Sequence, residues 1–442
     1  MREQREKTTS AENGRIIISQ IKSVISKRLP DLLPGFKSLK DSRNRKEYSM
    51  EELLAGALFM FIFKQASRNA YNNKRGDIIF AKNYYRHFRL RLPHPDAIDQ
   101  VMRDLPPEFL EELKAQLVSH LIEKKLFRKF RLLGKYYLVA VDATGIQTFK
   151  ARHCEHCLTK TSKNGVVSYF HYVLEAKLVT SSGHAISLAS EFIENLEHRD
   201  FDKQDCEQKA FVRLAAKIKR HFPRLPICVL ADGLYPNETT FSICRKNDWR
   251  FIITLKEGCL KTFNEEVGLL KATAKGRSVY RASKTTRTLL DYKFMNDIQY
   301  NKHDYSWVSC IETVTHLPEM TKKVQQFVYI TDLPLTPDNV VPIADGGRLR
   351  WKIENEGFNT QKNLGYELEH KFSRVSYNAM QNYYQLLQIA HMINQFAEKS
   401  RDLVLLTNAH SKQTIKDLWE KLLTFMASIP YTEAQLQEFM TG

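Results

Sequence analysis

The segment from Tyr136 to Gly145 places the strongest constraint on how this chain can fold. It reads Tyr-Tyr-Leu-Val-Ala-Val-Asp-Ala-Thr-Gly, so a run of strand-forming residues leads to Asp142 and a Thr-Gly pair typical of a turn follows at once. The pattern predicts a buried strand that ends at a sheet edge on one carboxylate. Because a charge beside an apolar core costs free energy unless it is paired or metal-bound, Asp142 is a candidate functional group.

Two later segments carry carboxylates that are expected to meet Asp142. Ile227 to Gly233, Ile-Cys-Val-Leu-Ala-Asp-Gly, is a second short apolar strand ending on Asp232, and the helix-like run from Arg348 to Lys362 carries Glu354. Three carboxylates brought together repel one another, and a hard divalent cation with oxygen ligands would neutralise them. The sequence therefore predicts a metal site; the alternative is three unrelated surface acids.

The helix predicted around Glu354 can be analysed by angle. Residues four and seven apart share a face of an α-helix, so Arg350, Glu354 and Gln361 are expected on one face, with Lys362 within about a quarter turn of it. Glu356 is expected on nearly the opposite side. Glu354 and Glu356 are therefore not interchangeable in the prediction.

Three other positions of this helix predict packing rather than chemistry. Trp351 and Phe358 share a separate stripe, which is assigned to the core. Gly357 in mid-helix costs about 1 kcal/mol relative to Ala, which indicates that another group passes close to it. Earlier in the chain, Glu207 is assigned to the first turn of a helix, where an acid favours the helix dipole.

The net charge of the chain restricts the class of partner that it is expected to bind. A formal charge of +17 predicts a polyanionic partner, with nucleic acid as the first candidate and an anionic membrane surface as the second. No apolar run approaches the length of a membrane span, and the first residues do not form a signal peptide. Seven scattered cysteines fit reduced thiols, so a cytoplasmic protein is expected.

Basic and aromatic residues alternate between Arg68 and Arg91. Arg86 and Arg89 belong to this segment, and such a mixture suits phosphate contacts with nearby stacking. The alternative is a solvated helical face with no partner.

Periodicity divides the 442 residues into five segments within an α/β fold. Helical spacing dominates residues 1–130, which are predicted to form an α-helical, DNA-binding domain. Strand-like runs then alternate with helices, and a Lys-, Arg- and Thr-rich stretch with strand-like runs at 307–314 and 325–330 precedes the Glu354 helix. The predicted parts are a mixed-sheet core (131–257), a β-rich insertion (258–343), the rest of the core with the Glu354 helix (344–397) and a C-terminal helical tail (398–442).

Three sequence blocks in this order resemble a known family. Val-Asp-Ala-Thr-Gly, Ala-Asp-Gly-Leu-Tyr and Arg-Trp-Lys-Ile-Glu-Asn-Glu-Gly-Phe-Asn are similar to the DDE transposases of insertion sequences, in particular the insertion-sequence-four type, over about residues 136–395. The resemblance implies an RNase H-like catalytic core with the first Asp on strand one, the second after strand four and the Glu on the last helix. It also implies a β-rich insertion before that helix.

The family resemblance also implies an activity, metal cofactors and binding partners. It implies a transposase that cuts insertion-sequence ends and joins them to target DNA, using two Mg²⁺ ions, or Mn²⁺, held by Asp142, Asp232 and Glu354. The partners implied are terminal inverted repeats and target DNA, bound by a homodimer. A different class of function is a catalytically idle DNA-binding protein or regulator derived from such an enzyme.

The chain departs from the family pattern at two positions. The family's helix carries Tyr-x2-Arg-x3-Glu-x6-Lys, and Arg350 and Glu354 fit it. Gly347 stands at the Tyr position and Gln361 at the Lys position, with Lys362 one place later. Arg350, Gln361 and Lys362 are nevertheless expected to contact DNA.

A Cys-x2-Cys pair, Cys154 and Cys157, resembles half of a zinc site. No second Cys pair has comparable spacing, and His171 or His184 could complete the site only through folding. The alternative is a loop of reduced thiols and histidines that binds no metal.

Overall fold

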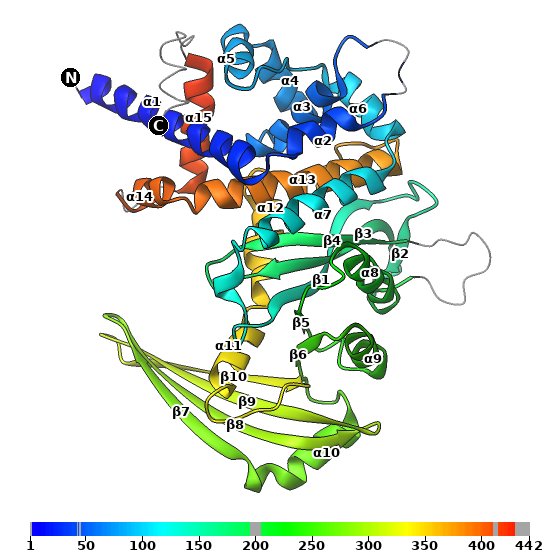
Figure 1. Ribbon diagram of the computed structural model, residues 1–442, viewed down its shortest axis with the longest axis vertical. Coiled ribbons are helices and arrows are strands. Elements are labelled where there is room, and N and C mark those ends of the chain that lie inside the picture. Colours follow the sequence, from blue (N-terminus) through cyan, green and yellow to red (C-terminus); the bar gives the residue numbers. More distant parts are fainter. Residues whose placement is uncertain (1, 42, 44–45, 195–204, 410–413, 429–442) are drawn as a thin grey trace.

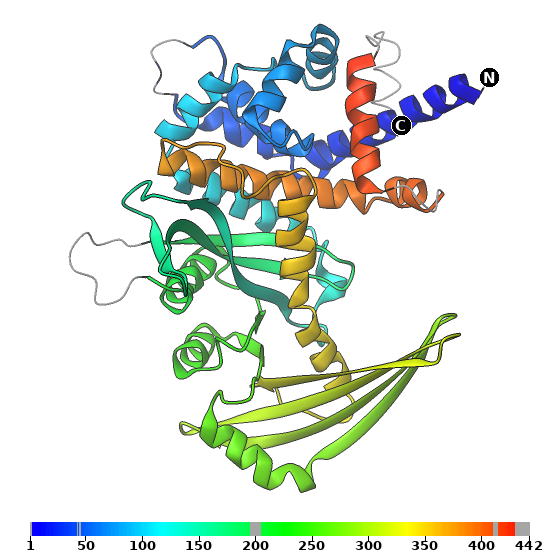
Figure 2. The same ribbon diagram turned by 180° about the vertical axis from the view of Figure 1, so that it is seen from behind.

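The computed structural model describes residues 2–41, 43, 46–194, 205–409 and 414–428. It is a mixed α/β fold in which one sheet of ten strands is covered at one end by a layer of helices (Figures 1 and 2). No helix among these residues is long and apolar enough to cross a membrane.

The helical layer joins the two ends of the chain. Its longest buried helix, α3, is apolar along almost its whole length and starts with a capping box in which Ser49 and Glu52 bond each other's backbone. Within this layer α13 contacts both α3 and β4, so the C-terminal segment completes the same core (Figure 1). The members are α1 (Arg2–Ser23), η1 (Val24–Arg28), α2 (Leu32–Ser38), α3 (Met50–Ile62), α4 (Arg68–Gly76), α5 (Ile78–Phe88), α6 (Pro95–Asp104), α7 (Pro107–Glu123), α13 (Tyr377–Glu398), α14 (Arg401–Ala409) and α15 (Ile415–Ser428), with the short η2 (Arg128–Phe130) leading to the sheet.

The sheet has the order β4-β3-β1-β5-β6-β10-β9-β8-β7, with β2 on the end of β3. β1, β5 and β6 are parallel, and all other neighbours are antiparallel. The strands are β1 (Tyr137–Phe149), β2 (Leu158–Thr161), β3 (Val167–Val179), β4 (Ala185–Ile193), β5 (Ile227–Ala231), β6 (Arg250–Thr254), β7 (Lys275–Ala282), β8 (Thr286–Tyr300), β9 (His303–His316) and β10 (Thr321–Thr331). α8 (Glu207–His221) leads from β4 to β5, and α9 (Glu238–Asn247) connects β5 to β6.

The first strand is longer than the sequence predicts. The Thr-Gly pair does not turn the chain; β1 continues to Phe149 because β3 pairs with it along this whole stretch, and a bulge after Gly145 absorbs the irregularity. Asp142 therefore lies within a strand rather than at its end. β3 and β4 form an antiparallel hairpin, with Gly183 at φ +80° in its turn.

The predicted insertion at 258–343 continues the same sheet instead of forming a second one. After α10 (Lys261–Leu270) and η3 (Lys271–Thr273), the strands β7 to β10 form a curved antiparallel extension that joins the core where β10 pairs with β6 (Figure 1). The strand-like runs at 307–314 and 325–330 are confirmed as parts of β9 and β10. The chain then returns through α11 (Val340–Arg348), η4 (Ile353–Asn359) and α12 (Thr360–Asn363).

Candidate active site

Two of the three predicted acids lie at the same level of neighbouring parallel strands. β1 and β5 pair from Tyr137 with Ile227 to Ala140 with Leu230, so Asp142 and Asp232 each follow the last pair by two residues. The pairing stops there because β5 ends at Ala231. The pairing of these strands brings both carboxylates to one end of β5.

The third acid, Glu354, lies near Asp142. Burial raises the pKa of Asp142; the guanidinium of Arg350 opposes this rise, and the charges of Asp232 and Glu354 add to it. Mutual repulsion of this kind requires the three carboxylates to lie near one another. Among the described residues, however, no three carboxylates have oxygens that all lie within 4.8 Å of each other, so a shared cation would draw these acids closer together.

Glu354 reaches this position on a widened helix. Residues 353–359 form a π-helix, in which backbone hydrogen bonds join residues five apart instead of the four of an α-helix. The predicted face, derived from α-helical angles, is therefore wrong beyond Glu354. Gln361 is fully buried, and its side-chain amide nitrogen lies 2.8 Å from Gln388 Oε1 and 2.9 Å from His391 Nδ1, so Gln361 cannot make the DNA contact that the sequence predicted.

Gly357 holds the π-helix against the sheet. A Cβ added at this glycine would lie 3.3 Å from the Cδ and Cε atoms of Lys177, a fully buried side chain of β3. The predicted close approach at Gly357 is thus confirmed, and the group that passes is the aliphatic part of a lysine. Its ammonium lies 3.1 Å from Glu175 Oε2, the carboxylate paired across from Asp142 on β3.

Two cations accompany the acids. Arg350 Nη1 donates to Asp142 Oδ2 at 3.0 Å, and the exposed ammonium of Lys256 lies 3.2 Å from Asp232 Oδ2. Trp351, which the sequence assigned to the core, is 52 % exposed instead, with the Arg350 guanidinium 4.4 Å from its ring centre. Phe358 alone fills the predicted apolar stripe. A cation and an exposed aromatic ring therefore lie directly beside the acids.

A fourth carboxylate, which the sequence analysis missed, belongs to this group. Burial raises the pKa of Glu207, at the start of α8, and the charges of Asp142 and Asp232 raise it further. The hydroxyl of the buried Tyr235 donates to Glu207 Oε2 at 3.4 Å. No spacing in the sequence indicates this proximity, because it depends on where α8 begins relative to β1 and β5.

The remaining predicted residues lie elsewhere. Lys362 pairs with Glu369 at 3.0 Å on the segment after α12. Arg86 and Arg89 lie on and just after α5, which Figures 1 and 2 place at the far end of the helical layer from β5. Arg86 lines a cavity of about 590 Å³ together with Arg75, Lys82 and Arg91. The structure therefore does not bring Arg86 and Arg89 to the acids.

A second basic cavity of about 600 Å³ lies where the helical layer meets the segment after α12. Its lining includes Arg68, Arg103, Lys371 and Arg374. Lys371 Nζ also lies 4.4 Å from the ring centre of Phe149, the last residue of β1. Phe149 lies seven residues after Asp142 along β1, so the two residues are about 23 Å apart along the strand at 3.3 Å per residue. β1 thus connects the acids to this basic cavity.

Divalent cations are expected to stabilise the protein at neutral pH but not in acid. The raised pKa values of Asp142 and Glu207 mean that the fold favours their protonated forms. That contribution to stability is full below the unfolded-state pKa, about 4, and is lost as pH rises through the raised folded-state pKa. Above it the ionised acids repel one another and can bind Mg²⁺.

Thermal unfolding with and without Mg²⁺ measures this effect. At 100 times its dissociation constant, Mg²⁺ should add about 2.7 kcal/mol to the stability near pH 7. The increase should vanish near pH 4 and in Asp142→Asn. An equal increase in Asp142→Asn would show that Mg²⁺ binds elsewhere.

Comparison with known proteins assigns no family. No protein-family model matches the chain, and no curated protein is significantly similar to it in sequence.

Proposed function

We propose that this protein is a DDE-type DNA transposase that cuts the ends of an insertion sequence and joins them to target DNA. The observation that carries the proposal is that Asp142 and Asp232 lie at the same level of paired strands, with Arg350 on Asp142 and with Glu354 near enough for its charge to raise the pKa of Asp142. These residues come from the three sequence blocks that resemble the family, and they are separated along the chain by 90 and 122 residues. Unrelated surface acids have no reason to converge in this way.

The topology supports an RNase H-like core. Counting β1, β3, β4, β5 and β6 as strands one to five gives the order 3-2-1-4-5, with an antiparallel first half and parallel strands one, four and five. On this numbering Asp142 lies on strand one and Asp232 directly follows strand four. Glu354 lies on the helical segment that follows the last strand. This is the arrangement that the family resemblance implies.

The chemistry of the donors suits hard divalent cations. Asp142, Asp232, Glu354 and Glu207 offer only oxygen ligands, as Mg²⁺ and Mn²⁺ prefer, and their mutual repulsion is relieved when a cation binds. Bound metal would supply an activated water or 3′-hydroxyl and would stabilise the leaving oxygen of a phosphodiester. Arg350 is placed to hold a phosphate oxygen once Asp142 turns to a metal.

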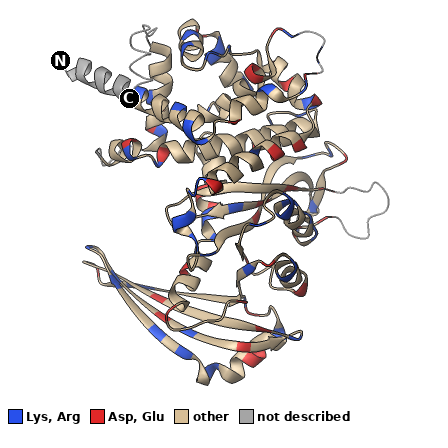
Figure 3. Ribbon diagram, viewed as in Figure 1, with Lys and Arg blue, Asp and Glu red and all other residues tan. Residues whose placement is uncertain are grey.

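Basic residues supply a DNA path from the acids to the helical layer. Lys and Arg are spread over both the helical layer and the outer strands β7 and β8 (Figure 3). The cavity with Arg68, Arg103, Lys371 and Arg374 lies next to the far end of β1, and the cavity with Arg86 lies beyond it in the helical layer. We propose that both bind the phosphates of the end DNA, and that a homodimer holds two ends.

DNA binding should weaken steeply with salt. Six to ten phosphate contacts would lower the affinity by about 10³–10⁵ between 50 and 200 mM salt, since each neutralised phosphate releases counterions. Fluorescence anisotropy with labelled end DNA measures the slope. Lys371→Ala and Arg86→Ala should each reduce it by about 1, whereas Lys246→Ala, at the far end of α9 from Asp232, should not. A slope near zero would contradict the DNA path.

The direct test of activity uses DNA that carries the inverted repeats flanking the gene. The purified protein should nick this DNA at the repeat ends when Mg²⁺ or Mn²⁺ is present and should fail to do so with a chelator. Binding without nicking under every metal condition would leave the idle DNA-binding protein as the function.

A further inference from the structure

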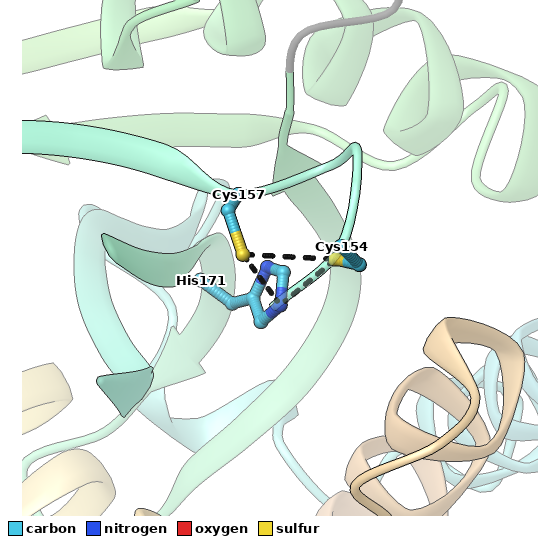
Figure 4. A group of neighbouring side chains, drawn as sticks. All are labelled: Cys154, Cys157 and His171. Carbon is cyan, nitrogen blue, oxygen red and sulfur yellow. Dashed lines mark hydrogen bonds between the residues drawn. The ribbon is translucent and has the colours of Figure 1, made fainter. Parts of the chain in front are cut away.

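A cluster of metal-binding side chains lies away from the acids, at the outer end of β1 (Figure 4). Cys154 and Cys157 belong to the loop between β1 and β2, and His171 lies on β3 opposite Gln147. The two sulfur atoms are 3.7 Å apart, and His171 Nε2 lies 3.4 Å from Cys154 Sγ and 3.7 Å from Cys157 Sγ. Folding thus completes the half-site that the sequence offered, and it does so with His171.

These three distances match the edges of a tetrahedral zinc site. With Zn–S about 2.3 Å and Zn–N about 2.0–2.1 Å, two sulfur ligands lie about 3.8 Å apart and a sulfur and a nitrogen ligand about 3.6 Å apart. The sulfur atoms are too far apart for a disulfide, which would place them at about 2.05 Å. Both cysteines are free thiols. One point close to all three donor atoms can therefore hold an ion.

The surroundings of the cluster favour a bound ion. Cys157 and His171 are buried and Cys154 is half-buried, so the thiols have little contact with water. The neighbouring histidines are held by other groups: His153 stacks on Phe149 at 4.2 Å, and His156 lies 2.9 Å from Glu194. Among the described residues no fourth Cys, His, Asp or Glu joins the cluster, so these residues supply three of the four ligands of a tetrahedral ion.

His184, the other histidine that could have completed the site, lies elsewhere. Its ring packs between Phe127 and Phe396, and its Nδ1 is 2.9 Å from Ser182 Oγ in the β3–β4 turn. His184 therefore serves as a built-in control for any test of the cluster.

We propose that Cys154, Cys157 and His171 bind one Zn²⁺ ion, which fixes the β1–β2 loop to β3. Two thiolates and an imidazole are ligands that zinc prefers, whereas Mg²⁺ prefers oxygen ligands. The proposed zinc site is therefore separate from the site formed by the acids. The loop it fixes carries His156, whose ring stacks on Tyr377 at 4.0 Å, at the start of α13. The ion thus ties the outer edge of the sheet to α13 of the helical layer. The proposal does not depend on transposase activity.

Cobalt replaces zinc as a visible probe of such a site. The full-length protein, reduced and stripped of metal with a chelator, should bind one equivalent of Co²⁺ at the thiolates, whatever further Co²⁺ the acids bind. It should then show thiolate-to-cobalt charge-transfer bands in the near ultraviolet and the strong visible bands of tetrahedral cobalt. Added Zn²⁺ should abolish both, and the protein as purified should contain one zinc per chain by elemental analysis. Weak bands typical of octahedral cobalt, or none, in the wild-type protein would overturn the proposal.

Substitutions locate the ion. Cys157→Ser and His171→Gln should lose the charge-transfer bands or reduce their intensity at least tenfold, whereas the exposed Cys206→Ser and the outlying His184→Gln should keep them. Asp142→Asn should also keep them, which separates this site from the acids. Bands that survive in both Cys157→Ser and His171→Gln would place the metal elsewhere. Should either variant fail to fold, the wild-type titration still decides whether a thiolate site exists.

Discussion

Glu354→Gln is expected to lower the rate of DNA nicking by about 10²–10⁴ while leaving the affinity for end DNA almost unchanged. The substitution keeps the shape of the side chain but removes one of the charges that a cation at Asp142 and Asp232 requires. Loss of metal assistance costs several kcal/mol of transition-state stabilisation, and each 1.36 kcal/mol is a factor of about ten in rate. DNA binding depends on Lys and Arg side chains and should survive.

The matched control lies two residues along the same helix. Glu356 pairs with Lys352 and its Oε1 lies near Gly183 in the β3–β4 turn, away from Asp142. Glu356→Gln should therefore nick DNA at nearly the wild-type rate. Nicking on a denaturing gel and binding by mobility shift measure both variants. An active Glu354→Gln together with an inactive Glu356→Gln would show that the third carboxylate has been assigned to the wrong residue.

Lys177→Met is expected to lower the free energy of unfolding by about 3–5 kcal/mol, because it leaves the carboxylate of Glu175 buried without its cation. Both side chains are fully buried, and Lys177 Nζ also bonds Gln388 Oε1 at 2.5 Å. Gln388 in turn bonds Gln361, which lies two residues beyond the end of the π-helix. The substitution should thus destabilise the π-helix that carries Glu354 as well as the core.

Urea unfolding followed by circular dichroism measures the loss. Lys352→Met provides the control, since Lys352 makes a partly exposed pair with Glu356 on the π-helix and such pairs contribute about 1 kcal/mol or less. Adding Glu175→Gln to Lys177→Met should recover part of the stability, because the unpaired charge is then gone. Equal losses in Lys177→Met and Lys352→Met would show that the buried pair contributes nothing special.

The positions of Asp142 and Asp232 could be predicted from the sequence because each follows a short apolar run, and such runs pair in parallel when a helix connects them. The length of β1 could not be predicted in this way. Thr144 and Gly145 have the composition of a turn, and only the partner strand β3 keeps them extended. Tertiary pairing overrides the local preference there.

The face of the helix on which each residue near Glu354 lies could be predicted only where the helix is α-helical. The π-helix between 353 and 359 shifts every later residue, which is why Gln361 is buried and not at the site. Gly357 was the one local signal of this irregularity, and the group behind it, Lys177, is 180 residues away in sequence. Glu207 lies near the other acids because of where α8 packs on the sheet, and hydrophobic periodicity in the sequence does not predict that position.

The composition of the 258–343 segment predicted its strands but not their attachment. Edge strands pair with whichever strand lies free beside them, and here β10 adds to β6, so the insertion extends the core sheet. The zinc half-site likewise has one part that the sequence predicts and one part that depends on the tertiary fold. Cys154 and Cys157 were visible as a pair, whereas the choice between His171 and His184 depended on the register of β3 with β1.

The most direct test of the acid cluster is a crystal structure of the protein with Mn²⁺ and end DNA, with the metal located by its anomalous scattering. We expect metal density between the carboxylates of Asp142 and Asp232, with Glu354 as a further ligand at about 2.0–2.6 Å or through one water. Arg350 should then have released Asp142 and should contact a phosphate of the DNA. Manganese bound away from Asp142, or a fully occupied metal site that leaves Glu354 facing solvent, would contradict the account.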